Sequence, residues 1–308
     1  MLSRLPPLWS WGCFELRLGT GETRVDLSIC ATRDEGGQEA MAAALAAGSD
    51  WQLAGAVRPV LEEWARPGTL LFNAVPTIWL EYDMPDGSPQ PPFMFLTLME
   101  PSGIVPDRKP AELTGIFRSA LHLLPDRGDD AARLAQVERC ARALPAGGSI
   151  LHLAALPAWR QTQALRVNAG FPAGSLRGWL ERLGWTGSPR QWQIAAELFG
   201  EDGRRCVQTS VDVDEDGLAP GLTLEDSISS PARPEERTFL RRLVERGLCE
   251  PDKEEAVLAW VGEETVQLPD ADWLIRVSRK LSIKVMVDAE GCASVKAYLL
   301  FHARYTLF

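Results

Sequence analysis

The sequence of 308 residues lacks most of the short signatures that reveal catalytic chemistry. Only three histidines are present, His122, His152 and His302, and their spacing fits neither a zinc site nor the base that activates a nucleophile. There is no P-loop, no G-x-S-x-G and no H-E-x-x-H motif, so the usual sequence evidence for phosphate-loop, hydrolase or zinc-protease chemistry is missing. Function therefore has to be inferred from the arrangement of secondary structure.

The sequence also gives little indication of disulfide bonds, of membrane spans or of a basic surface. The six cysteines are scattered without a C-x-x-C pair, which predicts reduced thiols in a cytoplasmic protein. No apolar run approaches the roughly 20 residues that cross a bilayer, and the first residues make a poor secretory signal. The net charge of −10 argues against a nucleic-acid partner, because a phosphate backbone requires a basic surface. The composition is that of a soluble globular protein.

What the sequence has instead is a repeat of two short strands joined by a turn and followed by helices. The predicted strand pairs are Phe14–Leu18 with Arg24–Cys30, Ile78–Asp83 with Phe93–Leu98, Ile150–Leu156 with Ala164–Ala169, Cys206–Asp214 with Leu222–Asp226, and Ile283–Asp288 with Val295–Phe301. Their turns fall near residues 20, 87, 160, 217 and 290, a period of roughly 60–70 residues. Because the repeat covers the whole chain, residues 1–308 are predicted to form a single domain.

The segments between the strand pairs have the apolar periodicity of helices. Ser175 and Ser188 are suitable N-caps, Pro189 suits a first turn, and Gly247 follows a predicted helix end. The predicted helices are Gln38–Ala47, Val57–Trp64, Pro110–Leu124, Ala131–Leu144, Ser175–Leu183, Pro189–Phe199, Pro234–Arg246, Lys253–Trp260 and, before the last strand pair, Asp270–Lys280.

Ten antiparallel strands either split into two sheets or close into a barrel. The strands alternate in polarity: Val25, Leu27 and Ile29 share one face, while Asp26 and Ser28 share the other. If helices cover the outside, the apolar face points outward to meet them and the polar face lines the lumen. The sequence therefore predicts an α/β fold, a ten-stranded antiparallel closed barrel with helices outside, built from five ββαα repeats.

This order of elements resembles the ABBA or PT-barrel prenyltransferases, and two short stretches add to the resemblance. The strand with Lys296 and Tyr298 is similar to the Lys-x-Tyr strands by which those enzymes hold a prenyl diphosphate. The strand with Asp26 and Ser28 looks like their early strand, where a carboxylate binds the aromatic acceptor. The resemblance implies a prenyltransferase that moves an allylic group from its diphosphate to an aromatic or peptide side chain, with Asp26 taking the acceptor's proton.

A diphosphate leaving group requires clustered cations in the lumen. Alternation puts five cations on polar strand faces: Arg17, Arg24, Arg166, Lys284 and Lys296. In a closed barrel the first and fifth strand pairs are neighbours, so four of these charges are expected to converge. The sequence leaves open the alternative that the cations neutralise nearby acids such as Glu15 and Asp288.

Two features depart from the prenyltransferase pattern: the chain has only three tyrosines, and its fourth strand pair carries acids where bases are expected. Seven acids occupy positions predicted to face the lumen: Glu15, Asp26, Glu81, Asp83, Asp212, Asp214 and Glu225. Such a lumen suits a cationic or peptide ligand, or an anion bridged by Mg²⁺. The alternative function is therefore a PT-barrel protein that binds such a ligand without prenylating it, and no cofactor is certain. Asp26 and Glu81 are the best candidates for catalytic carboxylates, and Trp79 is the best candidate for a substrate-binding ring.

Overall fold

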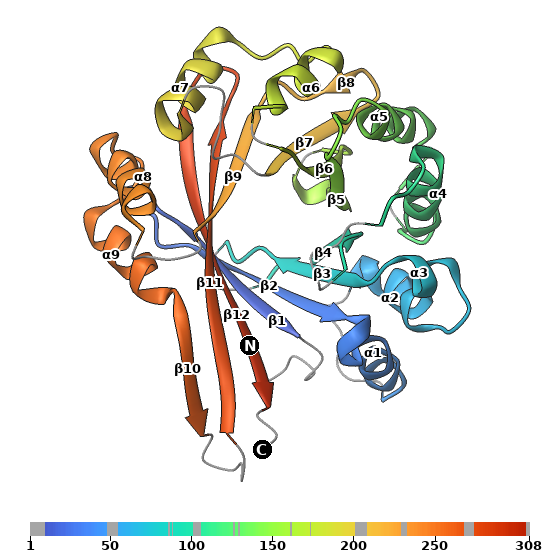
Figure 1. Ribbon diagram of the computed structural model, residues 1–308. Helices are drawn as coiled ribbons and strands as arrows, with labels where there is room; N and C mark the ends of the chain where they lie inside the picture. Colours follow the sequence, from blue (N-terminus) through green and yellow to red (C-terminus); the bar gives the residue numbers. More distant parts are fainter. Residues whose placement is uncertain are drawn as a thin grey trace.

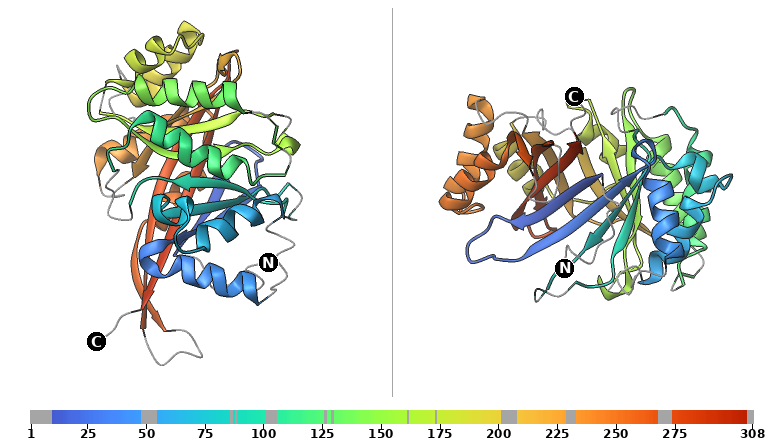
Figure 2. Two further views of the ribbon diagram at one scale, coloured as in Figure 1. Left: turned by 90° about the vertical axis from the view of Figure 1, so that its right-hand side faces the viewer. Right: turned by 90° about the horizontal axis from the view of Figure 1, so that it is seen from below.

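The chain is described by a computed structural model over residues 10–47, 55–85, 87, 89–100, 106–125, 127–128, 130–160, 162–172, 174–200, 208–228, 233–267 and 274–305. Its central feature is a barrel of ten antiparallel strands with helices around the outside (Figures 1 and 2). The barrel strands are β1 (Trp11–Arg17), β2 (Val25–Thr32), β3 (Thr77–Tyr82), β4 (Phe93–Thr97), β5 (Ser149–Ala155), β6 (Leu165–Gly170), β7 (Gln208–Asp214), β9 (Leu222–Ile228), β11 (Leu274–Val287) and β12 (Ala293–Tyr305).

The strands pair in the order in which they follow one another in the sequence. Each barrel strand is antiparallel to both of its neighbours, and β7 meets β9 through Gln208 opposite Glu225. The pairing of β12 with β1, from Trp11 opposite His302 to Arg17 opposite Lys296, closes the ring. The predicted fold class, a closed ten-stranded antiparallel barrel in an α/β protein, is confirmed.

Helices follow the strand pairs, so the order of elements repeats as strand, strand, helix, helix. In the described part of the chain the α-helices are α1 (Gly37–Ala46), α2 (Arg58–Ala65), α3 (Leu70–Ala74), α4 (Pro110–Leu121), α5 (Ala131–Arg142), α6 (Leu176–Arg182), α7 (Pro189–Phe199), α8 (Pro234–Glu245) and α9 (Pro251–Trp260). Helix α7 begins at a capping box, in which the Ser188 hydroxyl accepts from Gln191 N and the Gln191 side chain accepts from Ser188 N.

The apolar faces of the strands and helices meet in a layer between the barrel wall and the helices. Trp64 of α2 and Trp179 of α6 are fully buried in this layer. Their indole N–H groups donate to the backbone oxygens of Val75 at 2.8 Å and Cys140 at 3.0 Å. Each ring therefore buries a large apolar area without leaving its one polar atom unpaired. The main core lies outside the strands, and the inner strand face carries charged and polar side chains together with a few rings.

The helix predicted over Asp270–Lys280 is wrong where the structure describes it. Leu274–Lys280 is the first half of β11, and residues 268–273 lie outside the described residues. The alternation of Ile275 and Val277 with Arg276 has the period of a strand, not of a helix. This part of β11 extends beyond the barrel and pairs with β10 (Gly262–Gln267) and β12 in a three-stranded ribbon (Figure 1). A two-residue strand, β8 (Gly217–Leu218), occupies the turn predicted near residue 217.

Two further properties concern the described residues only. None of their helices is both long enough and apolar enough to cross a bilayer. Their cysteines are free thiols, of which Cys292 is exposed and the others are buried: Cys13, Cys30, Cys140 and Cys249. Burial raises the pKa of the Cys13 and Cys30 thiols, which keeps them protonated at neutral pH.

Replacing Trp64 with Ala should reduce the free energy of unfolding by about 3–5 kcal/mol, because the change leaves a cavity under α2 and an unpaired Val75 carbonyl. Urea denaturation measures the loss. Leu70→Ala on α3 is the control, since Leu70 is 48% exposed and its removal should change stability by only about 0.5 kcal/mol. Equal losses in the two variants would contradict the assignment of the core to the layer outside the barrel.

Candidate functional site in the barrel lumen

Three cations lie in a row across neighbouring strands on the inner face of the barrel. Lys284 of β11 is directly opposite Lys296 of β12, and Lys296 is directly opposite Arg17 of β1. On the next strands, Glu15 of β1 is opposite Asp26 of β2. Like charges at directly opposite positions destabilise a sheet. Lys284 has a carboxylate, Glu225 of β9, directly opposite on its other side, whereas Lys296 and Arg17 need a counter-ion from a diagonal position.

Each of the five cations predicted to hold a diphosphate has a carboxylate within ion-pair distance. Lys296 Nζ lies 2.5 Å from Glu15 Oε1, Lys284 Nζ 3.5 Å from Glu225 Oε2, Arg166 Nε 2.7 Å from Asp212 Oδ1, Arg24 Nε 2.7 Å from Asp26 Oδ1, and Arg17 Nη1 3.5 Å from Asp26 Oδ2. Asp288, the other acid considered as a partner, instead accepts a hydrogen bond from Cys292 N in the turn between β11 and β12. The lumen cations thus neutralise lumen acids.

A sixth cation enters the same network from a turn, and no sequence pattern predicts it. Arg160 belongs to the short 3₁₀ helix η5 (Ala158–Arg160) between β5 and β6. Its Nη2 donates to Glu81 Oε1 at 3.0 Å and to Asp83 Oδ1 at 2.8 Å. Its guanidinium carbon also lies 4.1 Å from the centre of the Phe93 ring. Arg160 therefore holds Glu81 of β3 and the neighbouring Asp83 from the turn between β5 and β6.

A cavity of about 130 Å³ lies inside the barrel among these charged pairs. Its aromatic walls are Trp79 of β3, Phe95 of β4 and Tyr298 of β12. Its polar lining is supplied by side chains from several strands: Ser28, Glu81, His152, Asn168, Gln208, Glu225 and Lys284. The cavity is therefore lined by rings on some sides and by polar groups, most of them acceptors, on others.

Two acceptors at this cavity have unused capacity. Asn168 Oδ1 of β6 is buried and has no hydrogen-bond partner among the described residues. Of the two Glu81 oxygens, only Oε1 is engaged within the same part of the chain, by Arg160. Buried acceptors are normally paired, because leaving one unpaired costs free energy. A group with N–H donors would satisfy both atoms.

The buried network shifts the pKa values of its members in different directions. Burial and the nearby Glu15 carboxylate raise the pKa of Glu81, against the opposing effect of Arg160. Burial would also raise the pKa of Glu15, but Lys296 holds it at about 2. Burial, reinforced by Lys284, lowers the pKa of His152 to about 4, so this ring is neutral at pH 7. A ligand can therefore change the charge of Glu81 more easily than that of Glu15.

His152 is neutral and hydrogen-bonded in the lumen, whereas His302 and Asp214 lie elsewhere. Its Nδ1 is 2.8 Å from Thr97 Oγ1. His302 lies near one end of the barrel, stacked on Trp11 and 3.2 Å from Glu35. Asp214 was expected to face the lumen, but it lies at the exposed end of β7 and pairs with Arg133 of α5 at 2.8 Å. It contributes no charge to the cavity.

Asn168 shows what sequence reasoning could have found and Arg160 shows what it could not. Asn168 follows Arg166 by two residues, so the same alternation puts both on the inner face of β6. Arg160 lies on a three-residue 3₁₀ turn, which has no periodicity to reveal the direction of a side chain.

Comparison with known proteins does not assign the chain to a family. No protein-family model matches this chain, and no curated protein resembles it closely enough to be a relative. Within the described residues, no group of three or more His, Cys, Asp and Glu side chains is arranged to hold a metal ion. Inferences about function therefore depend on the fold and on the lumen itself.

Replacing Glu15 with Gln should lower the free energy of unfolding by about 3–5 kcal/mol, because Lys296 would remain in the lumen without its counter-ion. Adding Lys296→Met in the same chain should restore most of the loss, since both charges are then absent. Glu181→Gln is the control: its pair with Arg177 is exposed, and its loss should cost at most about 1 kcal/mol. A double variant as unstable as Glu15→Gln would show that the pair is not the cause.

Proposed function

We propose that this protein is a PT-barrel-like binding protein whose lumen takes up a small cationic group, such as a basic side chain of a peptide. The observation that carries the proposal is the combination of paired lumen cations with unused acceptors. Each of the five predicted diphosphate-binding cations already has a carboxylate partner. Asn168 Oδ1 and Glu81 Oε2, in contrast, have no hydrogen-bond donor among the described residues.

Charge favours a cation over an anion. A diphosphate would have to displace carboxylates such as Glu15 from Lys296, and a displaced carboxylate would stay buried without its partner. Removing one member of a buried pair typically costs about 3–5 kcal/mol. A cationic ligand requires no such exchange, because it can bind Glu81 at the oxygen that Arg160 leaves unused.

The aromatic walls also suit a cation. Trp79, Phe95 and Tyr298 line the cavity, and ring faces attract ammonium and guanidinium groups. Lys284 already uses this interaction, since its Nζ lies 5.1 Å from the centre of the Tyr298 ring. The wall formed by Trp79 and Phe95 is available to a second cation.

The volume limits what can enter. The cavity of about 130 Å³ is close to the size of an apolar cavity of about 150 Å³ that holds one benzene molecule. It accommodates one side chain, while drug-sized ligands occupy roughly 300–1,000 Å³. The rest of the ligand would therefore lie along the barrel axis, as in a peptide that inserts one residue.

Glu81→Gln should weaken the binding of amine and guanidine probes by about 10–100-fold, the scale of a hydrogen bond to a charged group. Calorimetry with methylguanidinium, butylamine and Lys- or Arg-containing tetrapeptides measures the change. Glu62→Gln on α2 is the matched control, because that carboxylate is exposed and pairs with Arg58 on its own helix.

The same titration has an expected pH dependence. Burial raises the pKa of Glu81, and binding a cation requires the ionised carboxylate. Affinity should therefore increase as the pH rises through this raised pKa, with a proton released on binding, and the dependence should disappear in Glu81→Gln. Tight binding of pyrophosphate together with no binding of any amine would overturn the proposal.

Prenyl transfer is the second candidate, and one observation favours it. The row formed by Lys284, Lys296 and Arg17 ends at Arg17 Nη1, a buried donor without a hydrogen-bond partner among the described residues. In this case a diphosphate would bind these three cations together with Arg24 and Arg166. Asp26 and Glu81 would then orient an aromatic or peptide acceptor beside Trp79 and accept its proton. The allylic cation would form in a lumen that excludes water.

Incubation with dimethylallyl, geranyl and farnesyl diphosphate and with Trp- or Tyr-containing acceptors, with and without Mg²⁺, tests this candidate. Lys296→Ala should then weaken diphosphate binding by about 1.5–3 kcal/mol. Arg66→Ala, a mostly exposed cation on the outer surface, is the control. The absence of both product and diphosphate binding would leave cation binding as the function of the lumen.

A further inference from the structure

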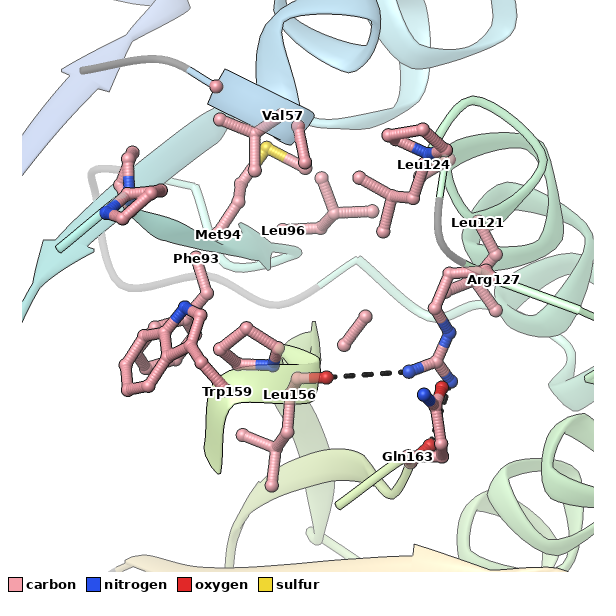
Figure 3. A pocket seen from close by; sticks show the side chains of 18 of the residues that line it. Val57, Phe93, Met94, Leu96, Leu121, Leu124, Arg127, Leu156, Trp159 and Gln163 are labelled. Carbon is pink, nitrogen blue, oxygen red and sulfur yellow. Dashed lines mark hydrogen bonds between the residues drawn. The ribbon is translucent and has the colours of Figure 1, made fainter. Parts of the chain in front are cut away.

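A second cavity, of about 240 Å³, lies outside the barrel wall near the start of β4. It is bounded by the 3₁₀ helix η4 (Gly55–Val57), the outer face of β4, helix α4 and the turn between β5 and β6 (Figure 3). Met94 and Leu96 of β4 face Leu121 and Leu124 across it. We call it the outer pocket, and its walls are almost entirely apolar.

Among the described residues, the one charged residue that lines the outer pocket, Arg127, is already paired. Arg127 donates to both oxygens of Asp130, at 2.7 and 3.0 Å. Its remaining donors reach the backbone oxygens of Gln163 at 2.9 Å and Leu156 at 3.4 Å (Figure 3). The Arg127 charge is thus neutralised by Asp130, and four of its five N–H donors are engaged, so a charged ligand would find no unpaired charge among the described residues there.

Open apolar space of this size is uncommon in a folded protein. Protein interiors pack as densely as organic crystals, with few voids larger than a water molecule. Apolar cavities exclude water, and one of about 150 Å³ binds benzene. The outer pocket exceeds that volume, and the ring of Trp159 at its edge is 38% exposed.

We propose that the outer pocket is a binding site for an uncharged hydrocarbon group, a ring or short chain somewhat larger than benzene. Its volume sets the size of the ligand, its walls select apolar atoms, and the pairing with Asp130 leaves Arg127 no free charge for a carboxylate or phosphate. The site is separate from the lumen cavity and does not depend on the function proposed for the lumen.

The outer pocket nevertheless shares two structural elements with the lumen. Phe93 lines the pocket, and its ring centre lies 5.3 Å from that of Phe95 in the lumen cavity. The guanidinium of Arg160 stacks on the same Phe93 ring. Trp159 at the pocket and Arg160 in the lumen network are consecutive residues of η5. A hydrocarbon in the outer pocket would therefore contact the turn that holds Glu81 and Asp83.

Methyl NMR of the full chain labelled at its six methionines tests the site, with Met94 assigned by Met94→Leu. Benzene and toluene should shift the Met94 methyl signal in a saturable way, and benzoate, which adds a charge to the same ring, should not. Ala120→Leu and Ala155→Leu each fill the pocket from a different wall and should weaken toluene binding at least tenfold. Ala44→Leu makes the same change at a half-buried position of α1 away from the pocket, and it should leave the affinity for toluene unchanged.

The result in the unmodified protein decides the proposal even if a filling variant fails to fold. A Met94 signal that does not respond to benzene or toluene, or that responds equally to benzoate, would overturn it. Unchanged toluene affinity in folded Ala120→Leu and Ala155→Leu would also overturn it, because the ligand would then be bound elsewhere.

Discussion

Closure of the ten-stranded ring is the constraint on which the rest of this structure depends. Once β12 pairs with β1, an inner side chain can reach water only along the barrel axis. The helices occupy the outside, so the apolar strand faces turn outward and the charged faces are enclosed. Glu15 and Asp26 are consequently almost fully buried. Such charges persist only with close partners, and the ion-pair network of the lumen follows from closure.

The strand register decides how that network is organised. It aligns Lys284, Lys296 and Arg17 on one arc, so Lys296 and Arg17 pair diagonally, with Glu15 and Asp26. Lys284 and Arg166 instead pair with carboxylates directly opposite on the neighbouring strand, Glu225 and Asp212. Beside Trp79 and Phe95 the pattern leaves acceptors in excess among the described residues, at Asn168 and at one oxygen of Glu81. The preference for a cation that we propose for the lumen rests on this excess of acceptors, and the turn with Arg160 links the lumen to the outer pocket.

Much of the fold could be predicted because its signals are local. Alternation of polarity identifies strands such as Val25–Thr32 wherever one face is apolar, and the repeat of strand pairs indicates closure. Prediction failed at Leu274–Lys280, which continues β11 beyond the barrel. There the strand no longer has one face against helices and one against a lumen, so its alternation is short: Arg279 falls on the same face as Ile275 and Val277. Helix α3 was missed because five residues are too few to show a helical period.

Which side chains share the inner face follows from the order of residues alone, because facing direction in a strand repeats every two residues. Alternation by itself is enough to assign Arg166, Asn168 and Lys284 to one surface. Which charges meet depends instead on tertiary structure, since partners are set by the register between distant strands and by turns without periodicity. Lys296 finds Glu15 across 281 positions of sequence, and Arg160 reaches Asp83 from a turn. Charge balance in the lumen is therefore a property of the closed barrel and not of any one strand.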